Sequence, residues 1–408
     1  MTMRMLRCKP FCSRSQSFLG NDAAVDKLES ATTALLAKWQ DCQTRSQNTS
    51  FSTPLPYMER LLALHAWIVG SAMSEPSKPV SDMVFVEYGG GRGFQSLLAR
   101  QLGIGTVVYN DIDPSACESA EGIAEELGLK ADFYVRGDVD GLVQFLEMHQ
   151  VMADAITSHD VLEHVYDIDY FLERLNTICG RDAVLMLCSG ANMFWYPFAK
   201  HAAKMQKQAE NIGLEEYKVG AFLKERMKII REFAPSLSED EVQRLGICTR
   251  GLVSRDIARV ADRYLQTGQV PKVIEHPTNT CNPYTGSWAE RSMNPYYIAE
   301  ALALTGFDAI VLPVPFEKTG SFGNDLLRSV LNIMIRLSGR NVGLYFSHAY
   351  AIHARYTGTS RRESHKQHMY AHSVAPVFRL VELSYELVSL FYPRRSFYSP
   401  QFGRHFWH

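Results

Sequence analysis

The sequence predicts an α/β protein built around a mostly parallel β-sheet. Short apolar runs rich in β-branched residues alternate with segments of helical spacing, as expected when each parallel strand needs a crossover connection. A glycine-rich turn at residues 89–93 follows one of these runs, and an acidic residue, Asp111, ends the next. These observations place the core of the fold at about residues 82–190.

Five strands are expected in this core. They lie at residues 83–87, 106–111, 133–136, 155–158 and 183–188. Two further strands are expected at residues 309–314 and 342–346, with a helix at residues 296–305 before the first of them. Between residues 192 and 268 the alternation stops and the sequence becomes charged and helix-favouring, which predicts a helical insertion before the last two strands.

Helical spacing also predicts two helices before the core, at residues 23–43 and 54–69, and the two prolines within residues 74–81 predict a linker. In the insertion, Ser238 and Glu241 have the spacing of a capping box. The chain therefore divides into an N-terminal helical extension (1–81), a core (82–190), a helical insertion or lid (191–292), the end of the core sheet (293–356) and a C-terminal basic and aromatic tail (357–408).

The composition is that of an ordinary folded protein. The 408 residues are 46% hydrophobic and 21% charged, which argues against global disorder. The net charge of -2 gives no general reason to expect a nucleic-acid partner. Eight scattered cysteines indicate a reducing, cytoplasmic compartment. The sequence contains no run of about 18 consecutive apolar residues, so no transmembrane helix is predicted.

Both ends of the chain differ from the rest. Residues 1–21 contain four basic side chains and no acid, which fits either a weak transit-peptide composition or a merely flexible start. The tail is basic and aromatic, which leaves open a weak peripheral membrane contact; a solvated face with packed aromatics is the simpler interpretation. Its apolar stretch at residues 374–392 is expected to dock on the protein body or on a second subunit, as in a homodimer.

The glycine turn carries the clearest functional signal. Glu87, Gly89, Gly91 and Gly93 form the pattern acid-x-G-x-G-x-G directly after an apolar strand. Glycine lets the backbone turn sharply and approach a ligand closely. A dinucleotide fingerprint requires G-x-G-x-x-G, and no register of this turn gives that spacing. The pattern favours S-adenosylmethionine over NAD, and the alternative is a turn that is glycine-rich for packing alone.

Three later strand ends are expected to complete a cofactor site at the same sheet edge. Asp111 is placed to accept the ribose hydroxyls, whereas Asp113 has the position of a helix cap. Asp138 could accept a hydrogen bond from the adenine amino group, or it could simply build a turn. His159 and Asp160 end the fourth strand and are further candidates for cofactor contact.

These motifs, in this order, resemble class I S-adenosylmethionine-dependent methyltransferases. The run His-Asp-Val-Leu-Glu-His-Val at residues 159–165 is similar to the D-V-L-E-H-V segment of methyltransferases of the quinone-biosynthesis type. The resemblance covers about residues 82–190 and returns at 293–356. It implies a Rossmann-like, seven-stranded, mostly parallel sheet with one antiparallel strand, and S-adenosylmethionine bound over the first two strand ends. It does not specify the acceptor.

Three histidines are candidates for a catalytic base. His159 and His164 flank the end of the fourth strand and could take a proton from a hydroxyl acceptor, or they could orient the loop or pack under the cofactor. His276 lies in a polar, aromatic stretch at residues 275–291 whose side chains suit a sugar. The alternative for this stretch is a connection built from turns and packed aromatics.

The resulting hypothesis is methylation of a hydroxyl on a polar small molecule, sugar or glycan, with the insertion as a lid. The alternative is a non-catalytic module that binds S-adenosylmethionine and serves a complex. Methylation of a nucleic-acid base is disfavoured because residues 158–161 lack the proline and aromatic residue that commonly hold a flipped base. No second acid stands at recognisable spacing from Asp160, so no metal is predicted.

Overall fold

The computed structural model describes residues 22–45, 49–73, 78–214, 219–270, 279–317 and 322–358. His276 lies outside these residues. So do the basic N-terminal segment considered as a transit peptide and almost all of the tail considered for membrane contact. Within the described residues, no helix is long and apolar enough to cross a membrane.

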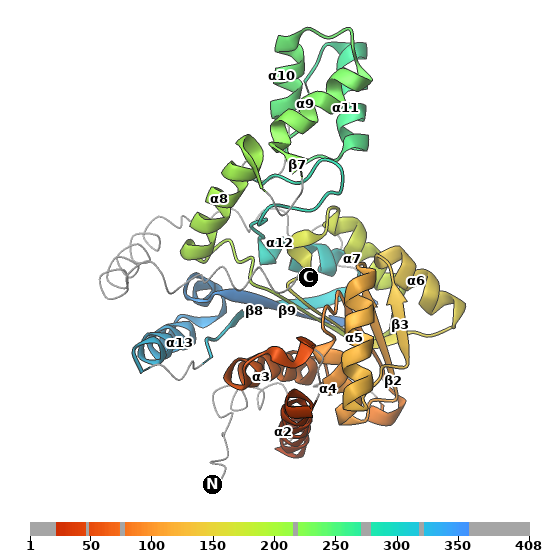
Figure 1. The fold of residues 1–408 in the computed structure, drawn as a ribbon, viewed down its shortest axis with the longest axis vertical. Coiled ribbons are helices and arrows are strands. Elements are labelled where there is room, and N and C mark those ends of the chain that lie inside the picture. The colour runs from red at the N-terminus through yellow and green to blue at the C-terminus, as the bar shows by residue number, and fades with distance from the viewer. Residues whose placement is uncertain are drawn as a thin grey trace.

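Seven strands of the described chain form one sheet in the order β3-β2-β1-β4-β5-β9-β8 (Figure 1). They are β1 (Val84–Tyr88), β2 (Thr106–Asp111), β3 (Phe133–Arg136), β4 (Ala153–His159), β5 (Cys179–Ser189), β8 (Phe307–Val314) and β9 (Ala349–Tyr356). Neighbouring strands are parallel except for β9, which runs antiparallel to both β5 and β8. The predicted fold class is therefore confirmed. The strand order reverses between β1 and β4, where sheets of this kind bind ligands.

One predicted strand is wrong. Residues 342–346 end helix α13 (Phe322–Gly343) and form the 3-10 turn η5 (Leu344–Phe346), and the last strand, β9, begins only at Ala349. The apolar residues 344–346 suggested a strand because they are buried, but they are buried in a turn rather than in the sheet. Alanines in β9, which disfavour strands in isolation, fit there because the strand is covered by neighbours on both edges.

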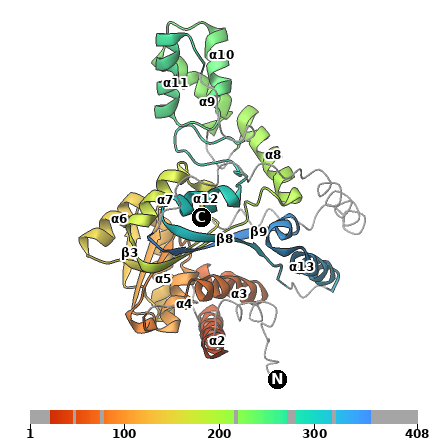
Figure 2. The ribbon, with the colours of Figure 1, turned by 180° about the vertical axis from the view of Figure 1, so that it is seen from behind.

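Helices cover both faces of the sheet (Figures 1 and 2). One face carries α2 (Asp22–Arg45), α3 (Leu55–Ala72), α4 (Phe94–Leu102) and α5 (Pro114–Leu127), whose apolar side chains share one core cluster with the sheet. The other face carries α6 (Val139–Met148), α7 (Ile168–Thr177) and α12 (Pro295–Leu304), which share a second cluster. The N-terminal helices α2 and α3 thus belong to the same hydrophobic core as the glycine loop.

The insertion contains α8 (Tyr196–Asn211), the short strands β6 (Gly213–Leu214) and β7 (Val219–Gly220), α9 (Phe222–Phe233), α10 (Glu239–Cys248) and α11 (Ser254–Thr267). Helices α9, α10 and α11 pack on one another and stand away from the sheet (Figures 1 and 2). The capping box of α10 is confirmed, because Ser238 and Glu241 exchange side-chain and backbone hydrogen bonds.

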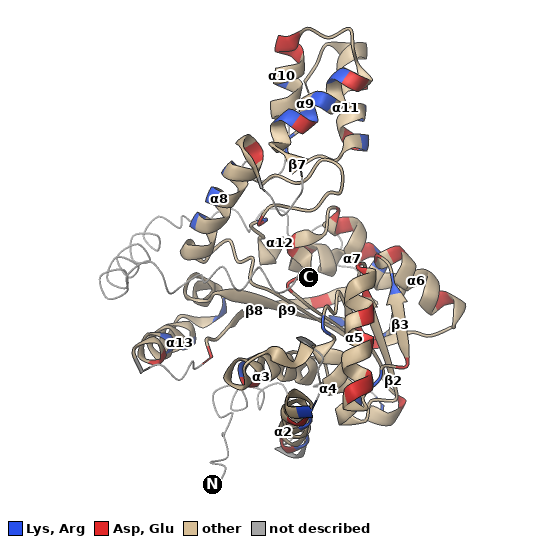
Figure 3. Ribbon diagram, in the orientation of Figure 1, with Lys and Arg blue, Asp and Glu red and all other residues tan. Residues whose placement is uncertain are grey.

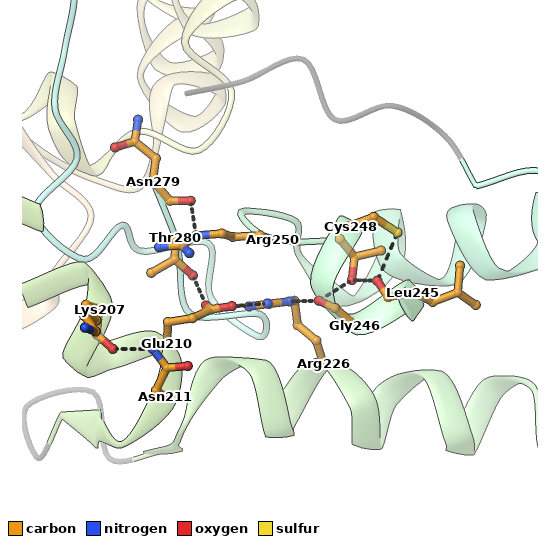
Figure 4. Close-up of polar contacts among 11 residues, drawn as sticks. Lys207, Glu210, Asn211, Arg226, Leu245, Gly246, Cys248, Arg250, Asn279 and Thr280 are labelled. Carbon is orange, nitrogen blue, oxygen red and sulfur yellow. Dashed lines mark hydrogen bonds and ion pairs between the residues drawn. The ribbon is translucent and has the colours of Figure 1, made fainter. Parts of the chain in front are cut away.

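A buried ion pair holds the root of the insertion together (Figure 4). Arg226 of α9 is fully buried and donates two hydrogen bonds to the carboxylate of Glu210 in α8, at 3.0 and 2.5 Å. Arg226 also donates to the carbonyl of Gly246 in α10 at 3.0 Å, and Thr280 donates to Glu210 at 2.8 Å. Three helices and the loop that leaves the insertion therefore meet at one pair of charges.

Charged residues divide unevenly among the helices (Figure 3). Acidic residues lie along α5, and α8 carries three exposed lysines, Lys200, Lys204 and Lys207. These groups face different parts of the molecule, so the low net charge of the chain conceals local patches of either sign.

Candidate cofactor and acceptor site

The glycine loop has the backbone conformation that its sequence predicts. Gly89, Gly91 and Gly93 have positive φ angles of 63°, 52° and 74°, a region that side chains disfavour. A Cβ at Gly90 would lie 2.4 Å from the ring of Tyr109, whereas a Cβ at Gly91 would meet nothing within 4 Å. The loop is therefore packed tightly against β2 on one side and is open beside Gly91.

Glu87 shapes this loop from beneath. It is buried, and its carboxylate accepts hydrogen bonds from the backbone amides of Gln95 and Ser96 at the start of α4, at 3.2 and 2.8 Å. Burial raises the pKa of Glu87 to about 7, against the opposing effect of its hydrogen bonds with Ser96 and Gln95. The carboxylate thus satisfies amides that a helix start leaves unpaired, and direct contact between Glu87 and a cofactor stays a prediction.

Asp111 lies at the tip of β2, beside the open part of the loop. One carboxylate oxygen accepts from the amide of Gly91 at 2.9 Å, and the other accepts from the amide of Asp113 at 2.9 Å. Each oxygen keeps a further lone pair, so the carboxylate could also accept ribose hydroxyls. Asp113 itself caps α5 through the amide of Ser115, as its sequence position suggested.

Asp138 caps a helix in this structure. One of its carboxylate oxygens accepts from the amides of Asp140 and Gly141 at the start of α6, both at 3.1 Å. The turn interpretation of this residue is therefore sufficient, and adenine recognition stays a prediction. Asn110, which the sequence analysis missed, ties the neighbouring loops together by donating to the carbonyls of Val135 and Gly137.

His159 and Asp160 form a pair at the carboxyl end of β4. The Nε2 atom of His159 lies 3.4 Å from a carboxylate oxygen of Asp160. Asp160 has a positive φ of 53° and accepts from the amide of Gly190 at 2.7 Å, so the loop after β5 fixes its orientation. A non-glycine residue held in this conformation is typical of functional sites.

A second histidine, missed in the sequence, stands against His159. His65 of α3 is buried, and its ring meets the ring of His159 edge-on with centroids 5.2 Å apart. The other neighbour of His65 is Phe94, the first residue of α4, with centroids 5.6 Å apart. Burial, aided by the nearby His159, holds the pKa of His65 well below its usual value, so this imidazole is neutral.

His164 and Glu163 lie in the 3-10 turn η3 (Leu162–His164). The residue His164 is exposed there. Glu163 is buried and accepts from the hydroxyl of Ser189 at 2.9 Å. Burial, with the charge of Asp160, raises the pKa of Glu163 well above its usual value.

The N-terminal extension is fastened to the glycine loop by Arg92. The guanidinium donates to the hydroxyl of Thr53 at 2.9 Å and to the carbonyl of Ser50, and it lies over the rings of Trp39 and Phe94. The segment before α3 is therefore part of the site, although no sequence motif marks it.

A further group of polar side chains gathers between α3 and α13. The loop after β8 is fixed by Asn332 of α13. Its side chain accepts a hydrogen bond from the amide of Phe316 at 2.7 Å and donates one to the carbonyl of Phe316 at 2.8 Å. Next to it, burial raises the pKa of Glu317 to about 7, with Arg60 and Arg328 acting in the opposite direction. Their contributions come from three separate segments, which is why spacing along the sequence could not reveal the group.

In the polar stretch considered for sugar binding, most of the described side chains bind or pack against other residues of the protein. Trp288 is buried and donates to the carbonyl of Val165 at 3.1 Å, and its ring stacks on Tyr166. Asn279 and Asn282 are buried and accept hydrogen bonds within the same loop. For residues 279–291 the packing interpretation is therefore the better one. The stretch anchors the insertion to the loop that follows β4.

Among the residues that the structure describes, no group of three or more His, Cys, Asp or Glu side chains could hold a metal ion. The described site instead consists of a glycine loop open beside Gly91, an acid ending β2, and a histidine with a carboxylate ending β4. Together with the order of the strands, these features define a Rossmann-like fold with a nucleoside-type cofactor site.

The comparison with family models agrees with this class of site. A model described as "Methyltransferase domain" matches residues 86–187, which run from β1 to β5. The matched part includes the glycine loop, Asp111 and the pair at the end of β4, so residues 86–187 are similar to a methyltransferase domain, whose cofactor is S-adenosylmethionine. The residues around Gly91 and Asp111 fit this cofactor, because the backbone is open where a Cβ would otherwise stand. No curated protein matches the chain.

Solved structures with partial likeness include three methyltransferase-related proteins. A putative S-adenosylmethionine-dependent methyltransferase from Streptococcus mutans is 13% identical, with 34% of this chain and 36% of that chain covered and a TM-score of 0.27. TrmN from Thermus thermophilus is 20% identical, with coverages of 31% and 38% and a TM-score of 0.26. A putative methyltransferase from Listeria monocytogenes is 10% identical, with coverages of 68% and 93% and a TM-score of 0.32. The chain thus spans only about a third of the first two proteins, and scores this low carry no argument about the acceptor.

Proposed function

We propose that the protein is an S-adenosylmethionine-dependent methyltransferase that acts on a hydroxyl group of a polar small molecule, sugar or glycan, with His159 as the general base. The observation that carries the proposal is the pair formed by His159 and Asp160 at the carboxyl end of β4, 3.4 Å apart. A hydroxyl acceptor gains from a base that removes its proton during transfer. Amine and carbon acceptors would make less use of such a pair.

Each neighbour of His159 supports this role. The carboxylate of Asp160 would stabilise the positive charge that the imidazole acquires when it takes a proton. His65 is neutral, so it adds no competing charge beside His159. The ring of His65, which itself packs against Phe94, contacts the ring of His159 and limits access of water to it.

The cofactor is assigned to the residues around the glycine loop. S-adenosylmethionine supplies a methyl group already activated on a sulfonium, so the protein needs mainly to align the acceptor and exclude water. We assign its ribose to Asp111 and its closest backbone approach to Gly89, Gly91 and Gly93. Glu87 acts indirectly by fixing the start of α4.

The insertion is proposed to act as a lid on the acceptor side. Its link to the site supports this idea, because Tyr166, just after η3, donates to Asp256 of α11 at 2.9 Å and accepts from the amide of Val253 at 3.1 Å. A movement of the turn that holds Glu163 and His164 would therefore be felt by the insertion.

The test is substitution of His159 in a methyl-transfer assay with a panel of sugars, other hydroxyl compounds, amines and RNA. His159→Asn is expected to lower kcat by about 100-fold or more, the usual contribution of a general base. Binding of S-adenosylhomocysteine should change little, because the glycine loop is intact. His149→Asn is the matched control, since His149 is an exposed histidine at the end of α6.

Two outcomes would oppose the proposal. Full activity in His159→Asn on a hydroxyl acceptor would remove His159 as the base. Tight binding of the cofactor without transfer to any member of the panel would favour the alternative, a binding module that serves a complex.

A further inference from the structure

Helix α13 is apolar on two sides. Its inner side packs against the sheet and η5 through Leu331 and Ile335, which are 8% and 2% exposed. Its outer side carries four large apolar residues that are strongly exposed: Leu326 at 59%, Val330 at 45%, Ile333 at 52% and Leu337 at 84%. A helix that is apolar on opposite sides is normally covered on both.

These four residues form one line, which we call the outer stripe of α13. Their spacing of four, three and four residues places them on a single face of the helix. The stripe extends for about 17 Å along the helix axis, at about 1.5 Å per residue. A contiguous apolar line of this kind marks an interaction surface, unlike single apolar residues scattered over a protein.

The chain itself supplies a segment that can reach the stripe. The described part ends at Gly358, whose amide donates to the carbonyl of Gly306 just before β8. Strand β8 is the edge of the sheet, and α13 lies beside it (Figures 1 and 2). Residues 359–373 could span up to about 50 Å when extended, whereas the eight residues of β8 measure only about 26 Å. Every position along the stripe is therefore within reach.

The sequence beyond that connection has the matching pattern. Residues 374–392 are apolar except for a few positions, and Arg379, Glu382 and Glu386 recur at spacings of three and four residues. This spacing predicts a helix with one narrow polar line and a broad apolar face. Arg336 is exposed beside the outer stripe, and Arg340 is exposed just beyond Gly339, where the backbone of α13 is kinked. Both positive charges thus lie near one end of the stripe, and they are opposite in sign to the two glutamates.

We propose that residues 374–392 form an amphipathic helix that packs on the outer stripe of α13 in the same chain. The docked helix buries the four apolar side chains and places Glu382 and Glu386 near Arg336 and Arg340. Because Asn332 and Arg328 of α13 hold the loop at Phe316 and Glu317, the same contact also stabilises the loop after β8.

Hydrogen–deuterium exchange on the full-length protein tests this docking. In the wild type, the amides of residues 374–392 should exchange slowly, and Ile333→Glu should speed their exchange about tenfold or more by placing a charge in the contact. Leu265→Glu is the matched control, because Leu265 of α11 is 48% exposed against 52% for Ile333. The control should leave exchange in residues 374–392 unchanged.

A charge exchange identifies the partner surfaces. Reversing Arg336 and Arg340 together (Arg336→Glu, Arg340→Glu) should speed exchange in residues 374–392. Adding Glu382→Arg and Glu386→Arg to the same chain should restore the protection. Binding of S-adenosylhomocysteine, measured alongside, shows that each variant remains folded.

Four results would overturn the proposal. Rapid exchange of residues 374–392 in the wild type would show that the segment does not dock. Protection that Ile333→Glu leaves intact would place the segment on another surface. Protection that rises with protein concentration, together with a dimer by light scattering, would identify a second copy as the occupant. Protection that occurs only with vesicles of anionic phospholipid would identify a membrane surface.

Discussion

Two buried glutamates, one beneath the glycine loop and one at the root of the insertion, ionise in opposite ways. The hydrogen-bond partners of Glu87 are uncharged groups of Gln95 and Ser96, and burial raises its pKa to about 7. Glu210 is also buried, and burial alone would raise its pKa, but the hydrogen bonds and charge of Arg226 hold the pKa below its usual value. Burial therefore raises the pKa of the glutamate in one region, whereas a buried cation lowers the pKa of the glutamate in the other.

The difference separates a functional region from a structural one. Glu163 and Glu317 share the raised pKa of Glu87, and all three lie around the carboxyl edge of the sheet, where chemistry is expected. In the insertion, the fully buried Arg226 neutralises its partner and satisfies a backbone carbonyl as well. The edge of the sheet thus holds acids whose pKa is raised by burial, whereas the insertion holds an acid whose pKa is lowered by a buried cation.

The largest effect is expected from breaking the insertion's ion pair. Arg226→Ala leaves Glu210 buried without its cation, which should cost about 3–5 kcal/mol in the free energy of unfolding. Urea unfolding measures the total loss, and hydrogen–deuterium exchange should localise it to α8, α9 and α10. Because the pKa of Glu210 is lowered on folding, the stabilisation by the pair depends on pH. It is present above about pH 4.5 and is lost as the pH falls through the pKa of Glu210.

A surface ion pair in the same insertion is the control for Arg226→Ala. Arg231 pairs with Glu239, but both side chains are largely exposed. Arg231→Ala should therefore cost less than about 1 kcal/mol. Comparable losses in the two variants would show that burial does not set the strength of the Arg226 pair.

The second effect belongs to the cofactor edge and depends on pH. Because its pKa rises from 4.5 to about 7 on folding, Glu87 binds a proton in the folded state that the unfolded chain has released. The folded state should therefore lose about 3 kcal/mol of stability through this residue as the pH rises from 4.5 through 7. Glu87→Gln should abolish that part of the pH dependence.

Urea unfolding of the wild type and Glu87→Gln at pH 5 and pH 8 checks this expectation. The difference between the two proteins isolates Glu87, because Glu163 and Glu317 are present in both. A difference in unfolding free energy that is the same at both pH values would contradict the raised pKa of Glu87.

The sequence predicted the regular part of the fold because local patterns determine it. The glycine turn, the acid ending β2 and the strands of the core stand where periodicity and turn chemistry placed them. The last strand was misplaced because β9 is defined by its position between β5 and β8, a long-range contact that no local pattern contains. The alanines of β9 favour the sheet only once those neighbours are present.

The site was predicted only where it follows motifs. His159 and Asp160 follow a strand in a recognisable run, and the structure brings them together. His65 lies about ninety residues earlier, in the middle of an amphipathic helix, where a histidine gives no sign of what it will meet. The sequence also did not reveal the group of Glu317, Arg60 and Arg328, because its members come from three separate segments that only the fold brings near one another.

A third test asks whether the space beside Gly91 belongs to the cofactor. Gly91 and Gly103 both have positive φ angles, 52° and 79°, and a Cβ at either would meet nothing within 4 Å. Alanine at either position should therefore cost a similar strain of about 1 kcal/mol. Only Gly91→Ala should weaken binding of S-adenosylhomocysteine, by about tenfold or more, because its Cβ would occupy the ligand's space. Isothermal titration calorimetry distinguishes the two variants, and equal affinities would place the cofactor elsewhere.

The smallest effect concerns the connection between the two regions. The hydroxyl of Tyr166 links the loop after β4 to α11, so Tyr166→Phe should destabilise that contact by about 1 kcal/mol, the worth of one hydrogen bond. The substitution should also change the rate of amide hydrogen exchange in α11. If the insertion responds to the cofactor edge, S-adenosylhomocysteine should slow amide exchange in α11 of the wild type and have less effect there in Tyr166→Phe. Tyr170→Phe is the control, because that hydroxyl bonds Asp140 on α6 instead. If the ligand leaves amide exchange in α11 of the wild type unchanged, the insertion, held by its own ion pair, moves independently of the site.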